Sequence, residues 1–211
     1  MSRISSHATL DALLARLIAP QAATRRTAAR MLRKLKIQAT GPSVLSALKW
    51  EINDPKAWET QYQMIMALGE CGYAEALPYL RGLSKSPRSK TMLGVALGDA
   101  IVRLSREHEH DAAPVLEILA GPDRDLIDGA FRAMAMLRMV PLPEARAPIL
   151  AFADHLPADD PLKLWVAAAA AGWEGTDVRG FLDRCRDSSR EDVRKAAAAS
   201  SAGEYLKWSP L

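Results

Sequence analysis

Residues 64–80 read MIMALGECGYAEALPYL, and residues 93–101 read LGVALGDAI. The pattern Ala-Leu-Gly-acid therefore occurs twice, at 67–70 and at 96–99. At such positions small residues let two neighbouring helices approach closely, while leucine fills the core. The recurrence indicates two copies of one structural unit and makes an internal repeat the first property to test.

Turn signals recur along the chain, mostly at intervals of thirty-odd residues. They lie at 19–20, 53–55, 86–87, 121–123, 159–161 and 187–189. Each is preceded by a short amphipathic stretch and followed by a longer one. Aspartate or serine before a helix accepts hydrogen bonds from its free amide groups, and proline suits the first helical turn. Each signal therefore marks the link between the two helices of an antiparallel pair.

The fold predicted from this pattern is all-α, an α-solenoid of about six antiparallel helix pairs in a single domain over residues 1–211. A single pair cannot bury both of its faces, whereas stacked pairs bury them against neighbours. The predominance of alanine and leucine, with only 6% aromatic residues, agrees with packed helices. The predicted repeats span residues 8–38, 41–72, 73–106, 110–139, 143–172 and 175–207.

The second repeat resembles those of the HEAT-repeat family. Asp54-Pro55, the run from Ala67 to Gly72 and Ala76-Leu77-Pro78-Tyr79-Leu80 follow the family's order and spacing. The resemblance extends less closely to the other repeats. It implies an α-solenoid whose second helices line a concave face that binds protein or nucleic acid. It implies no specific activity.

Charge is unevenly distributed along the chain. The net charge of the protein is +3, but residues 1–40 contain eight basic residues against Asp11 alone, a local charge of +7. Such asymmetry favours an acidic partner.

A cytoplasmic location is expected from the cysteines and the hydropathy pattern. Cys71 and Cys185 lack the spacing of a disulfide framework and are predicted to be small buried hydrophobes. The N-terminal apolar run is interrupted by Asp11 and Arg16, which argues against a signal peptide. No stretch reaches the roughly 20 apolar residues of a membrane span, so no membrane partner is predicted.

A helical wheel of residues 22–35 separates an apolar side from an arginine stripe. Ala28, Met31, Leu32 and Leu35 fall on the side predicted to be buried. Equivalent exposed positions on other second helices extend the stripe into a mixed-charge strip with a basic end. The predicted partner-binding residues are Arg26, Arg30, Arg33, Glu59, Gln63, Arg103, Asp128, Arg132 and Arg194.

The function predicted from this strip is non-catalytic binding of a protein partner, as adaptor, scaffold or inhibitor. Arginine binds carboxylates and phosphates alike, so a nucleic-acid ligand is the alternative. Acidic residues such as Glu59 and Asp128 interrupt the strip and favour protein. A solvated face of an end repeat would show the same pattern. The oligomeric state is not predicted.

No catalytic residue, metal site or cofactor is predicted. The stretch His108-Glu109-His110-Asp111 is read as a polar link between repeats, with Asp111 near a helix start, because alternate residues do not share a helix face. Its single His-Glu pair argues against the several such pairs of the HEAT-like deoxyhypusine hydroxylases. The HEAT-like alkylpurine DNA glycosylases resemble the chain in length and in tryptophan content, but no residue matches their catalytic aspartate. A bilin-lyase-like subunit shares only the architecture.

Overall fold

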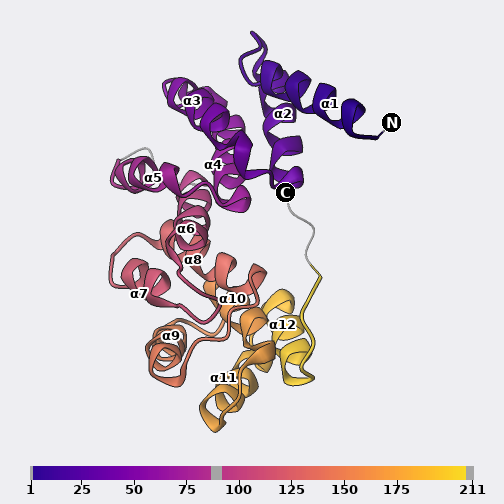
Figure 1. Cartoon of the computed structure of the whole chain (residues 1–211). Coiled ribbons are helices and arrows are strands. Elements are labelled where there is room, and N and C mark those ends of the chain that lie inside the picture. Colours follow the sequence, from indigo (N-terminus) through magenta and orange to yellow (C-terminus); the bar gives the residue numbers. More distant parts are fainter. Residues whose placement is uncertain (1, 87–91, 208–211) are drawn as a thin grey trace. The chain divides into compact units, whose positions relative to one another are not determined.

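The computed structural model describes residues 2–86 and 92–207, with side chains from residue 9 onward. Twelve α-helices and no β-strand occur in these residues (Figure 1). The prediction of an all-α protein built as an α-solenoid is confirmed. The turn predicted at 86–87 extends outside the described residues.

The helices fall into two compact units, residues 1–105 and 106–211. Unit 1 contains three helix pairs. Its helices are α1 (Ser2–Arg16), α2 (Ala22–Leu35), α3 (Gly41–Glu51), α4 (Trp58–Cys71), α5 (Leu77–Ser84) and α6 (Met92–Ser105). Short 3-10 turns precede α3, α4 and α5. The first and second helix of each pair pack on each other, and the second helices α2, α4 and α6 also pack in succession.

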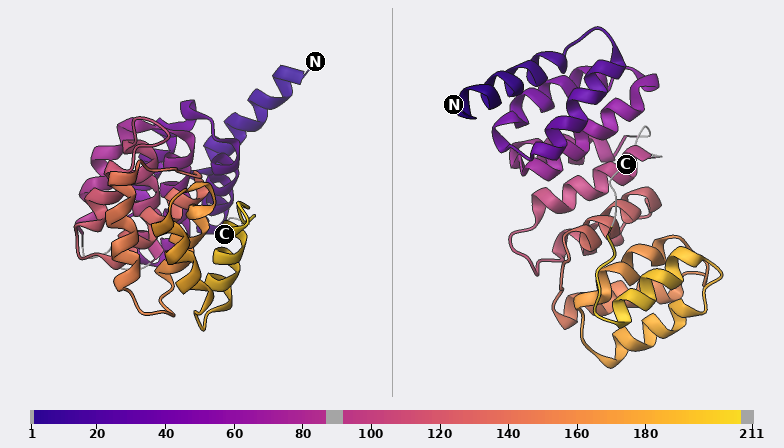
Figure 2. Two further views of the ribbon diagram at one scale, coloured as in Figure 1. Left: turned by 90° about the horizontal axis from the view of Figure 1, so that it is seen from below. Right: turned by 90° about the vertical axis from the view of Figure 1, so that its right-hand side faces the viewer.

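This serial packing is what buries the apolar residues of unit 1. Helix α4 lies between α2 and α6 and is buried along nearly its whole length. Met64, Leu68 and Leu97 are among the fully buried side chains of this core. The second-helix layer of the unit can be followed in Figure 1 and in the two views of Figure 2.

Unit 2 repeats the arrangement with shorter helices. They are α7 (Ala113–Leu119), α8 (Arg124–Met136), α9 (Pro143–His155), α10 (Leu162–Ala169), α11 (Thr176–Arg186) and α12 (Glu191–Ser201). Helices α8, α10 and α12 pack in one succession, and α7, α9 and α11 pack in another. Phe131 and Phe181 are its largest fully buried side chains.

Each pair lies within or close to a predicted repeat, although α1 begins at Ser2, before the predicted start at residue 8. The described contacts divide the chain into the two units. That the whole chain forms a single domain stays a prediction.

Several helix ends show the predicted turn chemistry. The Asp54 carboxylate accepts a hydrogen bond from the amide of Lys56, and Asp123 accepts two from the first turn of α8. Gly72 ends α4 with φ of 71°, a left-handed conformation that favours glycine. Gly41 begins α3, where the ring of Tyr73 packs so closely that a Cβ would lie 2.1 Å from it.

Gly69 explains one copy of the Ala-Leu-Gly-acid pattern. A Cβ added to this residue of α4 would lie 2.8 Å from Cα of Ala100 on α6. The absence of a side chain therefore allows the close approach of two second helices that the sequence predicts.

The cysteines are free and buried, as predicted. Burial raises the pKa of the Cys71 thiol, and it raises that of Cys185 to about 11. At about pH 8 only about one Cys185 thiol in a thousand is then ionised, and the thiolate is the reactive form. We expect no rapid reaction with a chromogenic thiol reagent in the native protein, and two reactive thiols after denaturation in guanidinium chloride. A thiol that reacts fast in the native protein would contradict this packing.

Candidate partner-binding surface

The predicted strip begins on α2, where two of its arginines reach solvent. Arg26 is partly exposed and forms an ion pair with Glu59, which lies at the start of α4. Arg30 is exposed one turn further on. The structure therefore places Arg26, Arg30 and Glu59 on the surface of unit 1, as predicted.

The expected exposure is wrong for Arg33 and Gln63. Arg33 is buried between α2 and α4, where its Nε donates to Oε1 of Glu70 at 2.7 Å and its Nη1 donates to the Gln63 amide oxygen at 3.3 Å. Lys36 adds a second cation 3.6 Å from Glu70. The wheel treated α2 as a helix with one buried side, but the flank facing α4 is buried too. Charges on that flank hold neighbouring second helices together.

Arg103 also pairs within the protein. Its guanidinium donates to the carboxylate of Asp99 one turn earlier on α6, and the Asp99 side chain is completely buried. Only 12% of the Arg103 side chain is exposed. This arginine therefore keeps a buried carboxylate compensated and offers little of its surface to a partner.

In unit 2, the three predicted residues differ in exposure and in their contacts. Arg132 is buried on α8, contrary to its predicted exposure. Asp128, one turn earlier, is partly buried and accepts a hydrogen bond from Trp165 on α10. Arg194 is exposed on α12, but its Nη1 donates at 2.7 Å to the carbonyl groups of Ser188 and Ser189, so it stabilises the turn before its own helix.

Burial raises the pKa of the Asp128 carboxyl above its ordinary value of 3.8, while the Trp165 hydrogen bond and Arg132 favour the charged form. Because the folded-state pKa is raised, the stability contributed by this group is present at low pH and falls as pH rises through that pKa. Replacing Trp165 by Phe removes a donor to the carboxylate, so we expect the Asp128 pKa to rise further. A carbon-detected NMR titration of the Asp128 carboxyl measures both values; a lower pKa in the variant would contradict the assigned hydrogen bond.

The hydrophobic side of α2 is also different from the wheel prediction. Ala28 and Leu32 are buried, as predicted, but 41% of Met31 and 48% of Leu35 is exposed. Arg25 is buried next to the α1–α2 turn.

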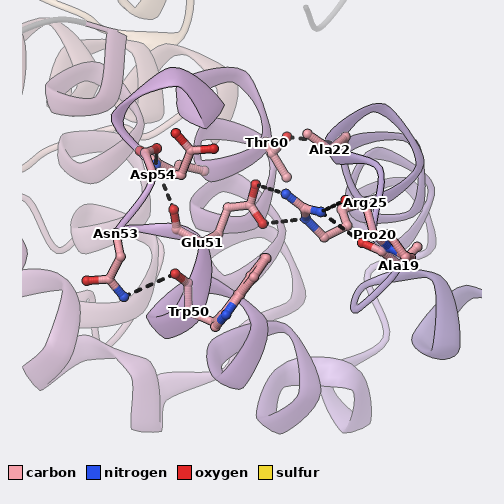
Figure 3. Close-up of polar contacts among 10 residues, drawn as sticks. Ala19, Pro20, Ala22, Arg25, Trp50, Glu51, Asn53, Asp54 and Thr60 are labelled. Atoms are coloured by element: carbon pink, nitrogen blue, oxygen red, sulfur yellow. Dashed lines mark hydrogen bonds and ion pairs between the residues drawn. The ribbon is translucent and has the colours of Figure 1, made fainter.

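Arg25 forms the most completely buried ion pair of α2 (Figure 3). Its Nε and Nη2 donate to the two carboxylate oxygens of Glu51 at 2.6 and 2.9 Å, and its Nη1 donates to the carbonyl groups of Ala19 and Pro20 at 2.8 Å. The Trp50 ring lies 4.8 Å from the guanidinium carbon. The pair fixes the turn between α1 and α2 on the end of α3, and nothing in its geometry points to a ligand.

What remains exposed on α2 is a mixed basic and apolar surface. We call it the α2 face and define it as Arg30, Met31, Lys34 and Leu35. All four side chains are exposed, and in the described part of the chain neither Arg30 nor Lys34 forms an ion pair. The basic residues of this face were predicted from the sequence. The exposure of its apolar residues was not, because Met31 and Leu35 fall on the side of the helical wheel that was expected to be buried.

The stretch His108-Glu109-His110-Asp111 lies before α7 in unit 2. No group of three or more His, Cys, Asp and Glu residues in 9–86 and 92–207 is arranged to hold a metal ion. Asp111 lies at a helix start, as predicted, and accepts a hydrogen bond from the amide of Ala113 at 3.0 Å. His110 Nδ1 lies 2.9 Å from the carbonyl oxygen of Val140.

A comparison with known protein families finds a match within unit 1. Residues 10–98 match the family model described as HEAT repeats, and this stretch runs from α1 into α6. Residues 10–98 are HEAT repeats. The α2 face therefore belongs to the first HEAT repeat of the matched stretch. Helices α4 and α6 are the second helices of the next two repeats. No curated protein matches the chain. Over the residues that the structure describes, no helix is long and apolar enough to cross a membrane.

Proposed function

We propose that the HEAT repeats of unit 1 form a non-catalytic binding module that engages a protein partner through the α2 face. The observation that carries the proposal is the exposure of two basic and two apolar side chains together on one helix. Exposed apolar residues mark surfaces that another protein covers, and methionine and arginine, both present here, are enriched in such surfaces. HEAT and related solenoids commonly use their second-helix layer for such contacts.

The internal ion pairs favour protein over nucleic acid as the ligand. A nucleic-acid groove needs basic side chains that continue from one second helix to the next. Along the second helices of unit 1, Arg33 and Arg103 are instead committed to Glu70 and Asp99. Phosphates would also leave Met31 and Leu35 uncovered. The specific role as adaptor, scaffold or inhibitor and the cytoplasmic location stay predictions.

Affinity capture with the full chain tests the proposal. The bait is compared with the variant Arg30→Glu with Lys34→Glu, which reverses the two charges of the α2 face. A matched control, Arg179→Glu with Lys207→Glu, makes the same change in net charge at two exposed positions of unit 2. We expect one protein to be captured in stoichiometric amount by the parent and the control but not by the α2 variant. Capture that is equal in all three would reject the α2 face as the site.

A parallel experiment examines the nucleic-acid alternative. Binding of duplex DNA to the full chain is measured over a range of salt concentrations, since phosphate contacts weaken steeply with salt. Tight, steeply salt-dependent binding that is lost in Arg26→Glu with Arg30→Glu would replace the protein proposal. Weak binding that these changes leave unaltered is the expected result.

A further inference from the structure

Helix α2 has an open flank within unit 1. Helix α4 packs between α2 and α6, whereas α2 packs against α4 alone among the second helices described there. Arg26 and Arg33 mark the flank that faces α4, because both pair with carboxylates of that helix. At about 100° per residue, Met31 and Leu35 project from roughly the opposite side. They therefore lie where a further second helix would pack.

An open end of a helical stack is normally polar, because nothing buries it. Here it carries an apolar row, Met31 and Leu35, beside a basic row, Arg30 and Lys34, and each row has the i, i+4 spacing of one helix ridge. Ridges of this spacing fit the grooves between the corresponding rows of a second helix. The shape of the surface thus favours a helical segment over an extended one.

Charge decides what kind of helix fits. Residues 12–50 contain no aspartate or glutamate, so no acidic side chain of α2 or its adjoining turns offsets Arg30 and Lys34. A second copy of the chain meeting this face through a twofold axis would bring basic residues against basic residues. An acidic amphipathic helix brings carboxylates to both cations and apolar side chains to Met31 and Leu35.

We infer that the partner segment is an acidic amphipathic helix that lies along the open flank of α2 and extends the second-helix layer by one member. This inference rests on the proposed function and names the chemistry of the partner. Met31 is well suited to such a contact, because its flexible, polarisable side chain adapts to the residue that covers it. The paired charges on the other flank keep α2 in place when the helix binds.

Synthetic peptides test the inference with the full chain. The probe is a fluorescent helical peptide with leucines in one i, i+3/i+4 row and glutamates in the adjacent rows. One control peptide has lysine in place of each glutamate, and a second has the same composition in an order that is not amphipathic. Binding is followed by fluorescence anisotropy. We expect the acidic probe to bind at least about tenfold more tightly than either control.

Two protein variants assign the binding to the α2 face. One double variant, Arg30→Glu with Lys34→Glu, removes the basic contacts, and the other, Met31→Ser with Leu35→Ser, removes the apolar contacts. Each should lower the affinity for the acidic probe by about tenfold or more. Circular dichroism confirms that each variant is folded. Arg179→Glu with Lys207→Glu should leave the affinity unchanged. Equal binding of all three peptides, or an affinity that neither α2 variant alters, would overturn the inference.

Two outcomes separate this inference from the proposed function. If the captured protein depends on the α2 face while the acidic probe does not bind, the acidic helix is wrong and the binding module stands. If sedimentation shows a dimer of the chain that Met31→Ser with Leu35→Ser dissociates, a second copy covers the face and the acidic helix is likewise rejected. If the acidic probe does not bind and capture of the partner does not depend on the α2 face, both proposals fail.

Discussion

Replacing Arg25 by Met is expected to lower the free energy of unfolding by about 3–5 kcal/mol, because it leaves the Glu51 carboxylate buried without its cation. The Glu51 side chain is 0% exposed, and both of its oxygens accept hydrogen bonds from the guanidinium. The substitution also frees the carbonyl groups of Ala19 and Pro20. Denaturant unfolding followed by circular dichroism measures the loss, which belongs to the transition of unit 1 if the two units unfold separately.

An ion pair of similar geometry provides the control. Arg184 also donates two hydrogen bonds to one carboxylate, that of Asp154, at 3.0 and 2.7 Å, but 58% of the arginine side chain is exposed. Arg184→Met should therefore cost less than about 1 kcal/mol. A loss at Arg25 that is no larger than the loss at Arg184 would contradict the buried position of the first pair.

The double variant Arg25→Met with Glu51→Leu shows whether the loss of stability comes from the uncompensated carboxylate or from the lost contacts to Ala19 and Pro20. It removes both ions and replaces them by apolar side chains, so we expect it to recover most of the stability that the single change loses. If the double variant is as unstable as Arg25→Met, the contacts to Ala19 and Pro20, not the uncompensated carboxylate, explain the loss.

Gly69→Ala is expected to destabilise unit 1 by about 1–2 kcal/mol, although alanine is the better helix former. The new methyl group would lie 2.8 Å from Cα and 2.9 Å from Cβ of Ala100, so α4 and α6 must move apart. Backbone atoms cannot rotate away as a flexible side chain can. The loss appears as a lower midpoint of denaturant unfolding.

Gly82→Ala makes the same chemical change where space is free. Gly82 lies in α5, and a Cβ added there would meet no atom within 4 Å. We expect this variant to be more stable than the parent by about 0.4–1 kcal/mol, because alanine restricts the unfolded chain and favours the helix. Equal effects of the two substitutions would show that α4 and α6 do not approach closely at Gly69.

The architecture was accessible from the sequence because its signals are local. Turn residues such as Asp54 and Asp123 accept hydrogen bonds from backbone amides two or three positions away, so their role can be predicted without knowledge of the rest of the fold. The alternation of short and long amphipathic stretches predicts helix pairs by the same reasoning. Gly69 could be interpreted correctly because the repeat itself supplies its neighbour, the corresponding helix of the next pair.

The binding surface depended on the tertiary structure. A helical wheel assumes that a helix has one buried side. In a stack, however, a second helix is buried by the first helix of its own pair and by the second helices of the neighbouring pairs. Arg25 and Arg33 became internal because Glu51 and Glu70, 26 and 37 residues away, come within hydrogen-bond distance of them. Met31 and Leu35 became external because, among the residues of unit 1 that the structure describes, no further second helix packs against that flank. Local sequence thus determined which segments are helical and how they pair, whereas the neighbours of each helix decided which charges hold the fold together and which remain available to a partner.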